Sequence, residues 1–181
     1  MTKKSLIILL ALVGLGLLTR LVWHPANTTA LAAIAVFAGF YFRANWSWLV
    51  PISVFAISDP FLGAYEWPVQ LSVYLSFLAV WQMGRRLKAR PSWWFGLAAV
   101  VVPSTLFFIV TNLAVWAFTP WYVKSFGGLA AALLAGVPFW RNMLIGDAVW
   151  LGIIFAAYYL LAVVEQGVFL SKLWYTKRVS R

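Results

Sequence analysis

Apolar residues occur along this chain in long blocks separated by short polar stretches and prolines. A helix needs about 20 mainly apolar residues to cross the hydrocarbon core of a bilayer. By that measure we predict six membrane-spanning helices, at about residues 5–23, 28–42, 46–61, 69–83, 93–118 and 143–164. The segment between the last two, residues 119–142, is too short to cross and return, so we expect one short interfacial or re-entrant helix there. The expected fold is all-α, a single polytopic transmembrane domain over residues 1–181.

Composition excludes a water-soluble globule. The chain is 64% hydrophobic and only 10% charged, which leaves too little polar surface to cover a soluble domain of this size. Lys3 and Lys4 followed by an apolar run resemble a secretory signal, but His24 and Pro25 follow that run where a small-residue cleavage site would stand. We therefore expect an uncleaved first span.

Charge predicts the orientation. The net charge of +10 comes from 14 Lys and Arg against 4 Asp and Glu. The basic residues form clusters beside apolar blocks, as the positive-inside rule requires of cytoplasmic segments: Lys3, Lys4; Arg85, Arg86, Lys88, Arg90; Lys172, Lys177, Arg178, Arg181. We expect a bacterial inner-membrane protein with both termini cytoplasmic, in contact with lipid and not with nucleic acid.

This topology brings polar residues from three distant loops to the outer side. The first outer loop holds His24, Asn27, Thr28 and Thr29, the second Asp59 and Glu66, and the third Arg141 and Asn142; Asp147 follows just inside the last span. We predict that they surround an outward-facing pocket.

An ionised aspartate within a span costs about 2.5–3.5 kcal/mol on insertion scales unless it is paired or hydrated. We therefore expect Arg141 to pair with Asp59 or Asp147, and Asn112 to hydrogen-bond the remaining acid. The alternative is that Asp147 and Asn112 only hold helices together. For two further residues the alternative to a binding role is also structural: His24 would be a polar residue at the membrane interface, and Glu66 a solvated charge in a loop.

The sequence lacks the motifs that would indicate a metal site, an ATP site or an enzymatic centre. The chain has no cysteine, a single histidine and no P-loop pattern, so we expect no metal site, no cofactor, no ATP site and no enzymatic activity. Small residues at helical spacing predict close helix approach, by internal packing in preference to a partner surface: Ala32, Ala35, Gly39; Ala131, Ala132, Ala135, Gly136.

Four segments together resemble one family: residues 24–42 (HPANTTALAAIAVFAGFYF), 50–63 (VPISVFAISDPFLG), 107–118 (FFIVTNLAVWAF) and 136–147 (GVPFWRNMLIGD). They are similar to small bacterial membrane proteins related to the substrate-binding S components of energy-coupling-factor (ECF) vitamin transporters, in particular the solitary cobalamin-specific ones. The resemblance implies a six-helix bundle that holds its substrate at the outer face and docks on an ECF energising module. It also implies that His24, Asp59 and Arg141 are pocket residues and that Tyr65 or Tyr74 lines the same cavity.

Two features depart from that family. The cobalamin-specific relatives are associated with a cysteine that ligates cobalt, and this chain has none, so only binding and transport carry over. S components usually present an Ala-x-x-x-Ala face on the first span to the energising module, whereas Ala11 is followed here by Leu15. Operation without an ECF module is therefore the alternative to docking on one.

The sequence thus predicts a substrate-binding protein for uptake of a vitamin-like small molecule, with cobalamin or another corrinoid as the best single candidate. Trp67, Trp121 and Tyr122 would contact its apolar body. The full set of expected substrate-binding residues is His24, Asn27, Asp59, Tyr65, Trp67, Tyr74, Tyr122, Arg141, Asn142 and Asp147. The main alternative is a structural or assembly protein with fully paired polar groups and no cavity; a membrane-embedded enzyme is the third.

Overall fold

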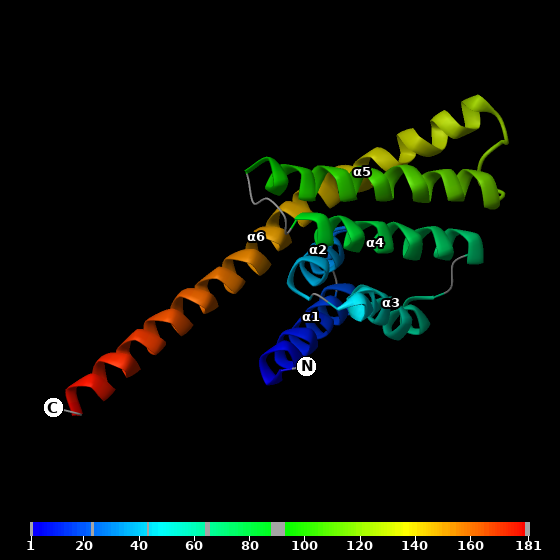
Figure 1. The fold of residues 1–181 in the computed structure, drawn as a ribbon. Helices are drawn as coiled ribbons and strands as arrows, with labels where there is room; N and C mark the ends of the chain where they lie inside the picture. The colour runs from blue at the N-terminus through cyan, green and yellow to red at the C-terminus, as the bar shows by residue number, and fades with distance from the viewer. Residues whose placement is uncertain (1, 23, 43, 64–65, 88–92, 180–181) are drawn as a thin grey trace.

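The fold is a bundle of α-helices. The structure, a computed structural model, describes the backbone of residues 2–22, 24–42, 44–63, 66–87 and 93–179, and the side chains of these residues except 87, 93, 95 and 167–179. Six α-helices and one 3₁₀ helix lie in these ranges (Figure 1): α1 Lys3–Leu21, α2 Leu31–Tyr41, η1 Asn45–Trp48, α3 Leu49–Leu62, α4 Trp67–Leu87, α5 Trp93–Phe118 and α6 Phe126–Val179. No strand occurs among them, so the expected all-α class is confirmed.

Three of the described segments are long and apolar enough to cross a membrane: Lys3–Leu21, Gly96–Phe118 and Phe126–Gln166. The protein is therefore a membrane protein, with fewer clear spans than the six predicted. Helix α2 has 11 residues and α3 has 14, lengths of about 16 and 21 Å at 1.5 Å per residue. Helix α4 has 21 residues, but polar side chains such as Gln70 and Gln82 dilute its apolar character.

Helix α2 is the core of the bundle. Residues 31–39 are all buried, and the helix packs against α4, α6 and α3. A Cβ atom at Gly39 would collide with the carbonyl oxygen of Trp81, and one at Gly84 with that of Val36. The backbones of α2 and α4 therefore touch, which confirms that Gly39 serves close helix approach.

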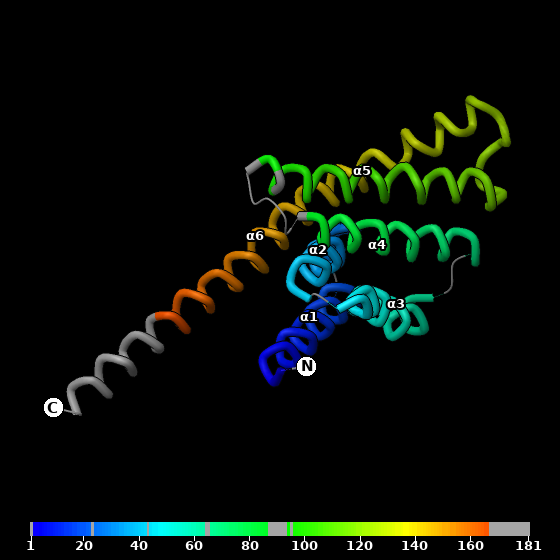
Figure 2. The backbone as a smooth tube through the Cα atoms, in the orientation of Figure 1, coloured from blue at the N-terminus to red at the C-terminus, as the bar shows by residue number. Residues whose placement is uncertain are grey.

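The separate interfacial helix expected within residues 119–142 does not form. Helix α6 runs without a break from Phe126 through Val179, a length of about 80 Å. Its small residues let it pack along α5: a Cβ atom at Gly136 would come within 2.7 Å of the Asn112 amide. Pro138 does not end the helix. The predicted outer helix and last span are thus two parts of one element, visible as the continuous diagonal tube in Figure 2.

The outer surface of the bundle suits lipid. Large apolar side chains are widely exposed on α1, α5 and α6, including Ile7, Ile109, Leu134 and Leu160. At one end of the bundle, Lys4 of α1 forms an exposed ion pair with Glu165 of α6, 2.5 Å apart. The start of α1 therefore lies at the level of Glu165, about three quarters of the way along α6.

Candidate functional site

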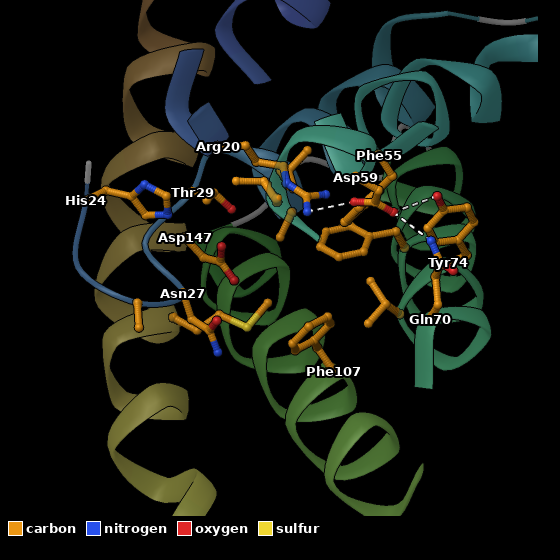
Figure 3. Close-up of a pocket in the computed structure, with 17 residues that line it drawn as sticks. Arg20, His24, Asn27, Thr29, Phe55, Asp59, Gln70, Tyr74, Phe107 and Asp147 are labelled. Atoms are coloured by element: carbon orange, nitrogen blue, oxygen red, sulfur yellow. Dashed lines mark hydrogen bonds and ion pairs between the residues drawn. The ribbon is translucent and has the colours of Figure 1, made fainter. Parts of the chain in front are cut away.

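A cavity of about 360 Å³ lies at the end of the bundle where α1 and α3 end and α2 and α4 begin (Figure 3). This volume falls within the range of about 300–1,000 Å³ that is usual for small-molecule sites. Its polar lining comprises Arg20, His24, Asn27, Thr29, Asp59, Gln70, Tyr74 and Asp147. Its apolar lining comprises Ala26, Leu31, Ala32, Phe55, Leu62, Val73, Phe77, Phe107 and Met143. All six α-helices and the α1–α2 loop contribute to it.

Asp59, near the end of α3, is the centre of a hydrogen-bonded cluster on one side of the cavity. Arg20 Nη2 donates to Asp59 Oδ1 at 2.8 Å, and the pair is nearly buried. Gln70 Nε2 donates to Oδ2 at 3.0 Å and the Tyr74 hydroxyl donates to the same oxygen at 2.8 Å. Gln70 and Tyr74 are four residues apart on α4 and so share one helix face. These three donors satisfy both oxygens of a carboxylate that would otherwise be costly to bury.

Arg20 is held on its other side by an aromatic ring. Its guanidinium carbon lies 4.4 Å from the centroid of the Phe55 ring, a cation–π arrangement. Its Nη1 atom is buried and has no hydrogen-bond partner among the described residues. The second guanidinium nitrogen thus keeps an unused donor close to the cavity wall.

Asp147 of α6 lies on the opposite side of the cavity and is only 3% exposed. Its Oδ2 atom accepts a hydrogen bond from Ser104 Oγ of α5 at 2.7 Å. No described side chain bonds its Oδ1 atom. In the described parts of the chain, a single side-chain atom is fully buried without a hydrogen-bond partner, and that atom is Arg20 Nη1. The unbonded Oδ1 atom of Asp147 is therefore not fully buried. Asp147 lines the cavity (Figure 3), and one of its carboxylate oxygens therefore remains free for a bound molecule.

The α1–α2 loop covers the cavity and is fixed to α6. Asn142 Nδ2 donates to the Ala26 carbonyl at 3.2 Å, and Trp150 Nε1 donates to the Thr28 carbonyl at 2.8 Å. Asn27 adopts a φ of 61°, a left-handed conformation that asparagine tolerates better than most residues. His24 Nδ1 lies 2.6 Å from the Val22 carbonyl oxygen. Ala26 and Thr28 of the loop are thus both hydrogen-bonded to α6.

The expected ion pair of Arg141 with Asp59 or Asp147 is wrong. Arg20 holds Asp59, Ser104 holds Asp147, and Arg141 is exposed with no ion pair in the described ranges. Arg141 and Asp147 are six residues, or about 1.7 turns, apart on one continuous helix, so they point in different directions.

Asn112 does not bond an acid either. Its Nδ2 atom donates to the Phe108 carbonyl of its own helix at 2.8 Å, and its amide packs against Gly136 of α6. It lies at the α5–α6 contact and outside the cavity lining.

Half of the expected substrate-binding residues line the cavity: His24, Asn27, Asp59, Tyr74 and Asp147. Trp67, Trp121, Tyr122 and Arg141 lie outside its lining, and Trp67 and Trp121 are more than 70% exposed. Asn142 touches the covering loop but does not line the cavity. Tyr65 lies outside the described residues.

Sequence reasoning missed Arg20, Gln70, Phe55 and Phe107. The available signal was Arg20, a basic residue within an apolar block with no neighbouring basic residue, because charges inside spans mark functional or paired positions. Asp59 and Asp147 are the two carboxylates of the cavity. Within the described ranges, no three His, Cys, Asp or Glu side chains gather where they could hold a metal ion.

A second, more open depression of about 330 Å³ adjoins the first. Ala56, Asp59, Pro60, Gly63, Gln70 and Tyr74 line it. Three of these residues, Asp59, Gln70 and Tyr74, line both spaces. The hydrogen-bonded cluster is thus the wall between the cavity and a depression that leads outward between α3 and α4.

Removal of one hydrogen bond from this wall should have a measurable effect. Tyr74→Phe is expected to lower the free energy of unfolding by about 1.5 kcal/mol, because the lost bond is to a charged acceptor in a partly exposed position. Tyr159→Phe is the matched control, since Tyr159 is 53% exposed and lies outside the cavity. Equilibrium unfolding in mixed detergent measures both. Equal stabilities of the two variants would show that the Tyr74 bond contributes nothing.

A comparison with protein families gives a match over most of the chain. A family model described as "Family of unknown function (DUF6580)" matches residues 1–169. No curated protein matches the chain.

Proposed function

The chain belongs to the DUF6580 family, described as a family of unknown function, and we propose that it is a substrate-binding membrane protein for uptake of a vitamin-like small molecule. The observation that carries this proposal is the cavity of about 360 Å³ into which Asp147 presents an unbonded carboxylate oxygen. A carboxylate oxygen that faces a mainly apolar cavity is poorly solvated, and a donor on a bound molecule would satisfy it.

The proposal places the protein in the bacterial inner membrane with the cavity facing outward. Lys3 and Lys4 at the start of α1 and Arg85 and Arg86 at the end of α4 lie at the end of the bundle opposite the cavity. The positive-inside rule makes that end cytoplasmic. Helices α2, α3 and α4 complete the six expected crossings, with the short α2 enclosed by the others. Inward release needs an energy source, which an ECF energising module or an ion gradient would supply.

The size of the cavity favours a molecule smaller than cobalamin. Its volume lies at the lower end of the range for drug-sized ligands, and a corrinoid with its nucleotide tail is several times larger than such a ligand. Binding of a corrinoid would require α3 and α4 to separate at the Asp59 wall. A compact vitamin-like compound fits the cavity without such a separation.

The alternative is a structural or assembly protein. In a structural protein of this kind, the outer polar groups would be hydrogen-bonded or paired with one another and would leave no cavity between them. The Asp59 cluster meets the first part of this expectation, but Asp147 and the cavity beside it do not. The arrangement therefore supports binding better than scaffolding.

Mass spectrometry of small molecules retained by gently purified protein tests the proposal. The matched variants are Val73→Trp, which fills the cavity, and Leu75→Trp, which adds the same side chain at an exposed position of the same helix. We expect the unaltered protein and Leu75→Trp to retain one compound that Val73→Trp does not retain. Deletion of the gene should reduce cellular uptake of that compound. Failure to find any compound that distinguishes the two variants would refute the proposal.

A further inference from the structure

The charges around the cavity do not balance. The groups that titrate or carry charge there are Arg20, Asp59, Asp147, His24 and Tyr74. Arg20 and Asp59 neutralise each other at 2.8 Å. Asp147 has no such counterpart, because no ion pair to it occurs among the described residues. When Asp147 is ionised and His24 is neutral, the cavity therefore carries one net negative charge, located on α6.

Asp147 is also poorly supplied with hydrogen bonds compared with Asp59. Asp59 accepts three, one of them from a guanidinium, whereas Asp147 accepts a single bond from Ser104. The Ser104 hydroxyl has one hydrogen, and its oxygen also lies 2.8 Å from the Val100 carbonyl, so even this bond has a competitor. Asp147 is only 3% exposed and has one neutral donor, so its ionised form is stabilised by a further donor or a positive charge.

The surroundings of Asp147 suit an organic cation. Phe107 lies on the same helix as Ser104, three residues further on, so the two side chains lie on neighbouring positions of one helix face. Phe107, Phe77 and Met143 give the cavity an apolar wall next to the carboxylate. A cation attached to an apolar body would meet the carboxylate with its charge and the aromatic rings with its body.

We propose that the cavity selects a small organic cation, an ammonium compound with an apolar body, whose positive charge pairs with Asp147 beside Phe107. This inference rests on the proposed function and names its substrate class. The Arg20–Asp59 pair and its hydrogen bonds from Gln70 and Tyr74 stay intact in this complex.

Three probes of nearly equal shape test the charge preference: phenethylammonium, 2-phenylethanol and phenylacetate. Binding to the full chain in lipid nanodiscs is measured by saturation-transfer NMR and calorimetry. We expect phenethylammonium to bind at least about tenfold more tightly than 2-phenylethanol, because truncation of a buried charge pair costs that much or more. Phenylacetate should bind least, since its carboxylate would face Asp147.

Substitutions test whether Asp147 is the source of the preference for the cationic probe. Asp147→Asn should remove the preference for phenethylammonium over 2-phenylethanol, whereas Glu66→Gln, at an exposed acid outside the cavity, should leave it unchanged. Phe107→Leu keeps the carboxylate and should weaken phenethylammonium more than 2-phenylethanol. The probe comparison on the unaltered protein needs no variant and so remains valid if Asp147→Asn does not fold.

The inference is overturned if phenylacetate or 2-phenylethanol binds as tightly as phenethylammonium, if none of the three binds, or if Asp147→Asn keeps the preference. These outcomes are separate from failure of the proposed function. An anionic or neutral compound retained by the purified protein but not by Val73→Trp would leave uptake standing and reject the cationic class.

Discussion

Arg20→Met is expected to lower the free energy of unfolding by about 3–5 kcal/mol, because it leaves the Asp59 carboxylate buried without its charge partner. Both side chains are about 90% buried, so water cannot replace the lost guanidinium. Gln70 and Tyr74 remain as neutral donors and do not compensate the charge. Equilibrium unfolding in mixed detergent, followed by circular dichroism, measures the effect.

The control for this prediction is the other ion pair of the described chain. Lys4→Met breaks the Lys4–Glu165 pair, which is exposed, and should leave stability almost unchanged because solvent screens both charges. The double variant Arg20→Met with Asp59→Leu should recover much of the loss, since no buried charge remains. Equal effects of Arg20→Met and Lys4→Met would contradict the account of the Asp59 cluster.

Gly84→Ala and Gly39→Ala are expected to destabilise the protein by about 1–3 kcal/mol or more, because each added methyl group meets backbone and not a flexible side chain. The methyl at Gly84 would press on the Val36 carbonyl and that at Gly39 on the Trp81 carbonyl. Helices α2 and α4 must then separate, and α2 is the centre of the core. The same unfolding measurement applies.

Two helical glycines with free space supply matched controls of the opposite sign. Nothing lies within 4 Å of a Cβ atom placed at Gly14 of α1 or Gly152 of α6. Alanine there should stabilise the helices by about 0.5–1 kcal/mol, because glycine loses more backbone entropy on folding. If all four substitutions had the same sign, the close contact of α2 and α4 would not be a feature of the folded protein.

Local sequence pattern predicted the helices well wherever a polar or proline stretch ends an apolar block. Helix α5 has the predicted bounds, 93–118, and α1 ends close to the predicted proline boundary. The pattern failed at α6. The small residues 127–136 do not mark a separate outer helix; they let the last helix begin early and pack along α5. That contact depends on a partner helix, which periodicity does not reveal.

The sequence predicts some residues of the cavity but not their bonding partners. Asp59 and Asp147 stand out because acids are costly within apolar blocks. Their partners follow from helix direction and tertiary packing: Arg20 is 39 residues from Asp59 and Ser104 is 43 residues from Asp147. Arg141 is predicted as the partner because the expected topology places it near both acids, but its position on α6 turns it away from Asp147.

Labelling of single cysteines most directly tests the central claim, that this cavity opens to the outer face of the membrane. The natural chain has no cysteine, so each introduced thiol is unique. Ala26→Cys lies in the exposed loop over the cavity, and Arg86→Cys lies exposed at the opposite end of the bundle. With a membrane-impermeant maleimide on intact spheroplasts, we expect Ala26→Cys to react at once and Arg86→Cys to react only after the membrane is permeabilised. Reaction of Arg86→Cys but not Ala26→Cys from outside would contradict the account.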